Sequence, residues 1–160
     1  MTQTVSKLDQ VCLHLMNNMK PFIKNNDLDG WQSGGTLMLC GDDLGTGFLL
    51  AKWRYGAVIQ IERFPHKRLN PYTLLGLLAT WVAEHDPQRH DLALDDPELD
   101  IEVVSDDHAQ VTIELELVDD IELLPDENGP LVYQGQRYRV ALVPVNTAEE
   151  AELHTQGPEQ

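Results

Sequence analysis

The chain has 160 residues, of which 42% are hydrophobic, and its formal net charge is −16. This length fits one domain that buries about two-thirds of its unfolded surface, and the hydrophobic content argues against a disordered chain. The negative charge repels a phosphate backbone, so we expect no specific nucleic-acid binding. We expect no membrane contact and no secretion signal, because no apolar run approaches the roughly 18 residues of a membrane span and the N-terminus lacks a basic start.

The first predicted element is an amphipathic helix near the N-terminus. Thr4 or Ser6 can cap it, and Pro21 stops or bends it. Its apolar residues follow the rhythm of one buried helical stripe: Leu8, Val11, Cys12, Leu15, Met16 and Met19. Cys40 lies further along the chain, and we expect both cysteines to stay reduced and to pack as small hydrophobic residues.

The next elements are a turn over NNDLDGWQSGG, a short strand at TLMLC and a long strand from Leu49 to Ile61. Every odd position of the long strand is apolar, and Lys52, Arg54 and Gln60 alternate with them, which predicts one buried face. The strand is long against the usual five or six residues. Gly56 is therefore expected to mark a bulge, a bend or a turn between two strands.

The stretch ERFPHKRLNP concentrates positive charge. Five of the 11 Lys and Arg residues lie between Lys52 and Arg68, whereas 17 of the 27 acids lie between Glu84 and Glu127. We hypothesise a protein-docking set that consists of Lys52, Arg54, Arg63, His66, Lys67 and Arg68. For Arg63, His66, Lys67 and Arg68 the alternatives are a solvated loop, docking on an acidic protein surface, and phosphate contact or catalysis.

The second predicted helix begins at Asn70-Pro71, a strong start signal, and runs to about Glu84. It is apolar around most of its circumference, and only Thr73, Gly76, Thr80 and Glu84 form a narrow small or polar stripe. Such a helix needs more cover than one sheet face provides, either from other elements of the fold or from a second subunit. Close backbone approach along the stripe would explain a glycine in the helix interior.

The remaining elements are strands. An acidic loop over residues 88–98 precedes a hairpin of LDIEVVS and VTIELEL with one wet face. VDDIELLPDENGP breaks the alternation, and LVYQGQRYRVALV predicts a second hairpin that turns near Gln134-Gly135. The fold class is α+β, with a largely antiparallel or mixed sheet and two main helices packed on it. We expect a single domain over residues 1–146 and a polar, flexible tail over residues 147–160.

Motifs that carry chemistry do not stand out. The glycines of GDDLGTGF lack the G-K-[ST] of a phosphate loop, and neither G-x-S-x-G nor H-E-x-x-H occurs. The stretch from His85 to Asp96 is the best metal candidate, but its spacing gives no fixed framework on which ligands converge. We therefore predict no catalytic residue, no cofactor and no metal site. A solvated loop or weak divalent-ion binding are the two readings of this stretch.

Several segments together resemble the tail completion protein R family of contractile-tailed temperate phages of the P-two type. They are a helix starting near SKLDQVCLHL, the strand pattern Y-x-A-x-I-x-I-x-x-F at residues 55–64, the helix LLGLLATWVAEHDP, and the strands DIEVV and VTIELELVDDIEL. The resemblance lies in their order and spacing and covers residues 6–124. The glycine-rich region from Trp31 to Gly47 and the hairpin after Pro125 depart from the pattern.

The resemblance implies a tail-terminator-like structural protein without catalysis or cofactor. Such proteins form a ring, typically hexameric, at the head-proximal end of the tail tube, where they stop tube growth and present a surface to the neck. The implied partners are other copies of the chain, tail tube and sheath proteins, and a neck or head-completion protein. The implied location is the virion tail, assembled in the cytoplasm of the bacterial host.

The charge pattern suggests how copies could meet in such a ring. A ring of identical chains uses head-to-tail contacts, which need two different complementary patches. Our hypothesis is that the basic region from Lys52 to Arg68 meets part of the acidic region from Glu84 to Glu127 on a neighbour or a tail partner. One alternative is an acidic inhibitor or DNA-mimic protein that binds a nucleic-acid enzyme. Another is a metal-dependent enzyme that uses the stretch from His85 to Asp96.

Overall fold

The computed structural model describes residues 4–143, so the predicted tail over residues 147–160 lies outside the described residues. The elements in chain order are β1 (Thr4–Val5), α1 (Lys7–Met19), the 3-10 turn η1 (Asn25–Asp27), β2 (Leu28–Asp43), β3 (Phe48–Phe64), α2 (Pro71–His85), the 3-10 turn η2 (Pro87–Arg89), β4 (Glu98–Val103), β5 (Ala109–Pro125), β6 (Leu131–Tyr133), β7 (Gln136–Val140) and β8 (Leu142–Val143). The α+β class with two main helices is confirmed.

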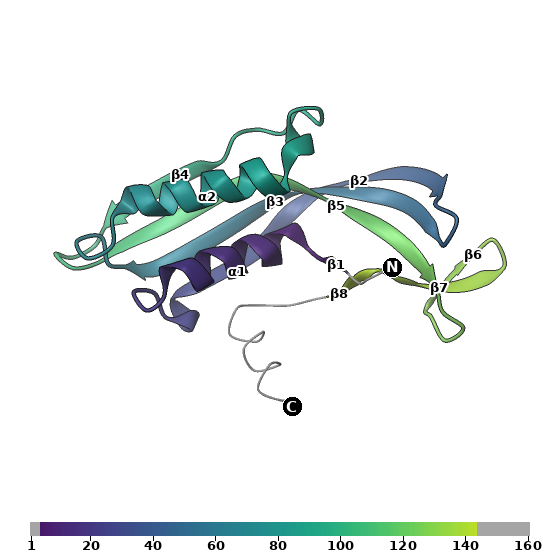
Figure 1. Ribbon diagram of the computed structural model, residues 1–160, viewed down its shortest axis with the longest axis horizontal. Coiled ribbons are helices and arrows are strands. Elements are labelled where there is room, and N and C mark those ends of the chain that lie inside the picture. The colour runs from purple at the N-terminus through teal and green to yellow at the C-terminus, as the bar shows by residue number, and fades with distance from the viewer. Residues whose placement is uncertain (1–3, 144–160) are drawn as a thin grey trace.

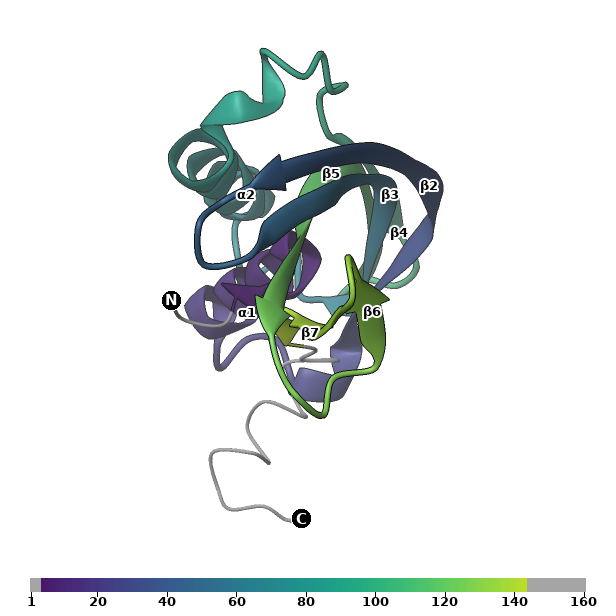
Figure 2. The same cartoon turned by 90° about the vertical axis from the view of Figure 1, so that its right-hand side faces the viewer.

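The sheet is antiparallel throughout and strongly curled. Its strand order is β2-β3-β5-β7-β6, and β4 pairs with the first part of β5. A separate pair of two-residue strands, β1 and β8, is parallel. Figure 1 shows both helices along one half of the long strands, while the other half projects beyond them. We call this projecting half, which ends in the β6–β7 hairpin, the arm; Figure 2 shows the curl of the strands from the arm side.

The core lies between the two helices and the sheet. The six residues of the predicted α1 stripe are all buried, and Ser6 caps the helix by accepting a hydrogen bond from the Asp9 backbone N–H at 3.2 Å. From the sheet, β3 contributes Tyr55, Ile59 and Ile61, and β5 contributes the alternating residues that face them. The apolar face of the strands, which repeats every two residues, therefore packs against the apolar face of α1, which repeats about every 3.6 residues.

Strand β2 is much longer than predicted. The stretch expected to form a turn is a turn only at η1, and from Leu28 onward it pairs with β3. The register shifts between Gln32 and Gly34, and Gly34 has a φ of 116°, which glycine adopts without strain. The turn prediction was wrong because glycines and polar residues suit a bulged edge strand as well as a loop.

Strand β3 runs without a break through Gly56, so this glycine marks neither a turn nor a bulge within β3. The bulge lies opposite, in β2, at Ser33. A Cβ built on Gly56 would lie 2.6 Å from the Ser33 hydroxyl oxygen, a distance that real contacts do not show. A side chain at residue 56 would therefore displace the Ser33 hydroxyl from its place beside this strand, which favours glycine here.

The predicted break in alternation after Leu117 is present, but it does not end the strand, because β5 continues to Pro125. The alternation ends because both Val118 and Asp119 are buried, but β3 pairs with this part of β5 as far as the Phe48–Leu123 pair. The C-terminal hairpin is confirmed as β6 and β7, and its turn residues Gln134 and Gly135 have φ values of 52° and 80°. Curling of the sheet lets β5 bury residues from both of its faces.

Helix α2 is covered on one side only. Leu74, Leu78 and Trp81 are buried against α1 and the sheet, whereas Gly76 and the other residues of the small stripe are exposed. A Cβ built on Gly76 would meet open space, so nothing within the fold explains this glycine by close approach. The elements between residues 4 and 143 thus account for part of the apolar surface of α2, and none of them covers its outer flank.

Candidate docking surface

The six predicted docking residues do not form one surface. Lys52 and Arg54 lie in the middle of the sheet, on the face without helices, and each has an acidic partner on β5. The Lys52 Nζ lies 2.8 Å from an Asp120 carboxylate oxygen, and an Arg54 nitrogen lies 3.1 Å from one of Glu116. Arg63 lies further along β3, roughly 30 Å from Arg54 at about 3.3 Å per residue. The set therefore divides into two groups. Lys52 and Arg54 have acidic partners on β5, and the remaining residues form a distant group.

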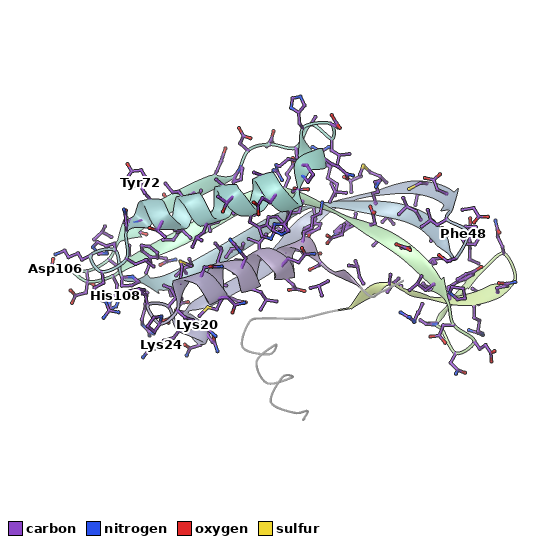
Figure 3. All side chains as sticks on the ribbon, viewed as in Figure 1. Lys20, Lys24, Phe48, Tyr72, Asp106 and His108 are labelled. Atoms are coloured by element: carbon purple, nitrogen blue, oxygen red, sulfur yellow. The ribbon has the colours of Figure 1, made fainter. Side chains whose placement is uncertain are left out.

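The distant group gathers around a hollow at the end of the molecule opposite the arm. The hollow has a volume of about 680 Å³, and three segments line it: the turn after α1, the end of β3 with its loop, and the β4–β5 turn. Figure 3 places Lys24 and His108 at this end and Phe48 at the other. We call the cationic residues that line the hollow the basic end: Lys24, Arg63, Lys67 and Arg68.

The basic end keeps a positive balance in a strongly negative chain. Its four cations face two acids, Asp27 and Asp107. Arg63 pairs with the buried Asp27 at 3.2 Å, and the Arg68 guanidinium lies over the Phe22 ring at 5.6 Å from its centroid. Neither contact removes the net positive charge, so the hollow can attract an acidic or anionic group.

Backbone hydrogen bonds hold the loop of the basic end in place. The N–H groups of Arg68 and Leu69 both donate to the Pro65 carbonyl oxygen at 2.9 Å, and the Asn70 side chain accepts from the Tyr72 N–H at 3.0 Å. His66 is half-buried, and its Nδ1 is buried without a hydrogen-bond partner among the described residues. A preformed loop loses little freedom on binding, which favours docking over a purely solvated role.

Acidic side chains gather on the sheet face that carries no helix. Residues that pair directly project to the same side, so Glu98, Asp100 and Glu102 of β4 share this face with Glu114 of β5. Glu98 stands directly opposite Glu114, an arrangement of like charges that destabilises a sheet. The hydrogen bond from the Asp95 backbone N–H and the Arg54 guanidinium lower the pKa of Glu116. This acidic face is complementary in charge to the basic end.

The stretch from His85 to Asp96, the best metal candidate in the sequence, contributes to a buried group of ion pairs. The Asp86 side chain is fully buried and lies 2.7 Å from Lys7 Nζ and 2.7 Å from Arg89 Nη1. Arg89 also donates to the backbone carbonyl oxygens of Glu116 and Asp95. These contacts join α1, the end of α2, the following loop and β5. Between residues 4 and 143, no group of three metal-ligating side chains could hold an ion.

A second buried acid lies close to this cluster. Asp119 accepts a hydrogen bond from the Lys7 backbone N–H at 3.0 Å, and it is hydrogen-bonded to Tyr55. Burial raises the pKa of Asp119 above its usual range, and burial together with the charge of Asp119 raises the pKa of Tyr55. Sequence reasoning missed this group of residues. Asp86 and Arg89 are close in the sequence, but Lys7 and Asp119 are 112 residues apart.

Comparisons with known proteins agree with the resemblance and extend it. A family model described as P2 phage tail completion protein R matches residues 5–142, which includes both regions that departed from the pattern. A curated protein of Haemophilus phage HP1, named as an uncharacterized 19.2 kDa protein in the rep-hol intergenic region, is 25% identical over 124 residues. That alignment covers 77% of this chain and 75% of the relative. No solved structure matches.

No helix of residues 4–143 is long and apolar enough to cross a membrane. The family match spans most of the chain and every element from α1 to β7. The chain therefore belongs to the P2 phage tail completion protein R family and has a structural role in the phage tail.

Proposed function

We propose that this protein completes the tail as a ring of identical copies at the head-proximal end of the tail tube, and that it helps to join tail to head. The family match supports a tail role. The observation that carries the proposed mode of action is the basic end: a preformed, net-positive hollow in a chain of net charge −16. A surface of this kind suits an acidic protein partner.

The basic end docks on an acidic surface of a neighbouring copy or of a tail or neck protein. The acidic face around Glu98 and Glu114 supplies such a surface within this chain, because its like charges are stabilised when cations approach. Lys67 is the most direct contact, since it is exposed and has no acidic partner among the described residues. Lys52 and Arg54 take part less directly, because each is already paired on its own sheet.

The test reverses charge at the basic end. Lys67→Glu with Arg68→Glu should prevent tail-to-head joining in a phage that lacks the natural gene, scored as infectious particles and as complete tails by electron microscopy. Arg137→Glu with Arg139→Glu on β7 is the matched control, because it changes the charge equally at sites outside the basic end and outside the docking set. A loss of oligomer mass by light scattering would place the contact between copies, and a normal mass with failed joining would place it on a tail partner. Normal mass together with normal joining would refute the docking role.

The acidic inhibitor or DNA-mimic alternative gains no support from the described residues. A mimic should carry acids spaced like the phosphates of a nucleic acid on one exposed face. Here Lys52 and Arg54 lie on the same face as the acids and neutralise Asp120 and Glu116. A pull-down that recovers a nucleic-acid enzyme and not tail proteins would favour the inhibitor or mimic over the tail role.

A further inference from the structure

The hollow of the basic end combines positive charge with apolar surface. Besides its four cations, it is lined by Pro21, Phe22 and Pro65. Phe22 is 38% exposed, although its ring lies beneath the Arg68 guanidinium. Side chains of both kinds at one opening suit a peptide that carries carboxylates next to an apolar residue, because ion pairs and apolar burial are then gained together. The hollow therefore fits a short acidic peptide that also carries an apolar side chain.

Residues 147–160 of this chain have that chemistry. They carry four glutamates and neither lysine nor arginine, and Glu149, Glu150 and Glu152 come shortly before the apolar Leu153. They follow β8, and they lie outside the family match over residues 5–142. The family match therefore says nothing of what they do.

The place where this segment is attached brings it within reach of the hollow. Val143 pairs with Val5 just before α1, and α1 leads to the turn that lines the hollow (Figure 1). Helix α1 has 13 residues and is about 20 Å long, at 1.5 Å per residue. Glu149 and Glu152 follow Val143 by six and nine residues, and an extended chain of that length spans about 20–32 Å. The glutamates can therefore reach the basic end of their own chain.

The surface along this path does not repel an acidic segment. Beyond Asp9, α1 carries no acidic residue, and its exposed residues include Asn17 and Asn18. Attachment through a few residues gives the glutamates an effective concentration at the hollow on the order of millimolar. The contact within one chain is therefore favoured over the same contact between separate molecules.

We propose that the segment from Glu149 to Leu153 binds in the hollow of the basic end of its own chain, and that an acidic surface of a partner displaces it when the basic end docks. Only the displacement rests on the proposed function. A contact of this kind suppresses docking between free copies, because the basic end is already occupied. It yields to a partner surface that presents more carboxylates or that is held close by on the tail.

Cross-linking of the purified full chain tests the contact directly. A carbodiimide joins an amine to a carboxylate that touches it, and mass spectrometry identifies the two residues. A lysine of the basic end should be joined to a glutamate of residues 149–152. A mixture of isotope-labelled and unlabelled chains distinguishes links within one chain from links between chains. Lys52 joined to Asp120, whose charged atoms are 2.8 Å apart, is the internal reference for the reagent.

A labelled peptide with the sequence of residues 147–160 measures competition for the hollow. In the full-chain variant Glu149→Gln with Glu150→Gln and Glu152→Gln, the attached segment no longer competes for the cations. By fluorescence anisotropy, the peptide should bind this variant more tightly than wild type. The expected gain is about tenfold, for a peptide Kd of about 0.1 mM and an effective concentration of about 1 mM.

The matched control removes three charges elsewhere on the surface. Glu84, Asp91 and Glu127 are all exposed, and none of them lines the hollow. Glu84→Gln with Asp91→Asn and Glu127→Gln should bind the peptide as weakly as wild type does. An equal gain in this control would show a general charge effect and would overturn the inference.

Three results of the cross-linking and binding experiments would also overturn it. The first is a basic end whose lysines are joined only to acids outside residues 149–152, such as Glu98 or Glu114 of another chain. The second is a set of links to residues 149–152 found only between different chains. The third is equal peptide affinity for wild type and the glutamine variant.

Displacement is tested on tails from a phage that lacks the gene. An excess of the free peptide should reduce completion of these tails by added wild-type protein, whereas a peptide with glutamine at positions 149, 150 and 152 should not. Equal yields with the two peptides would refute the displacement.

The occupied hollow and the proposed function fail separately. Links within one chain, together with normal tail joining by Lys67→Glu with Arg68→Glu, would refute the docking role and leave the occupied hollow standing. Failed joining by that variant, without such links in wild type, would refute the occupied hollow alone.

Discussion

Removing the Asp86 carboxylate should destabilise the protein more than any surface change. In Asp86→Ala the Arg89 guanidinium, with a side chain only 10% exposed, loses its carboxylate partner and cannot turn to water. Breaking a buried pair on one side costs about 3–5 kcal/mol, because a charge is left buried without compensation. Loss of the ion pair with Lys7 adds less to this cost, because the Lys7 side chain is 22% exposed and can be hydrated. For a chain of this size, at about 2–4 °C per kcal/mol, we expect a fall in Tm of roughly 6–20 °C.

The matched control is Asp120→Ala, which breaks an exposed pair of similar geometry. Lys52 and Asp120 are 2.8 Å apart, but their side chains are 33% and 54% exposed, so the expected loss is about 1 kcal/mol or less. Urea unfolding followed by circular dichroism gives both free energies of unfolding. The loss for Asp86→Ala should persist at about 1 M salt, where exposed pairs are screened. Equal losses for the two variants would refute the view that the buried cluster holds α1, α2 and β5 together.

Three further outcomes follow from the packing. Gly76→Ala should raise the free energy of unfolding by about 0.5–1 kcal/mol, because the site is open and glycine weakens a helix interior; a stabilised chain that no longer completes tails would locate a partner at this stripe. A thiol reagent should modify the exposed Cys40 in the native chain and Cys12 only after unfolding, because burial raises the pKa of Cys12 to about 12; rapid native labelling of both would contradict the packing of α1. Burial raises the folded-state pKa of Asp119, so the contribution of this residue to stability is present at low pH and is lost as the pH rises through that raised pKa. The Asp119→Asn variant should therefore gain stability relative to wild type as the pH rises over that window. Parallel curves of unfolding free energy against pH for the two proteins would contradict this expectation.

The sequence alone determined the elements whose signals are local. The α1 stripe and its Ser6 cap, the Asn70 cap of α2, the alternation of β3 and the Gln134-Gly135 turn each depend on residues a few positions apart. Periodicity and capping act over that short range, so these elements can be recognised from the sequence without knowledge of the fold. The order of these segments also sufficed for the family resemblance, which the family match over residues 5–142 confirms.

Tertiary structure decided whatever depends on pairing between distant segments. Strand β2 is a strand from Leu28 because β3 lies beside it, and β5 extends to Pro125 for the same reason, although neither shows regular alternation there. The charged residues were regrouped in the same way: Lys52 and Arg54 are neutralised by β5, while Lys24 from the turn after α1 joins Arg63, Lys67 and Arg68. Contacts of this kind depend on which strands become neighbours in the sheet. The pattern of residues along the chain does not say how far apart two distant segments lie in space.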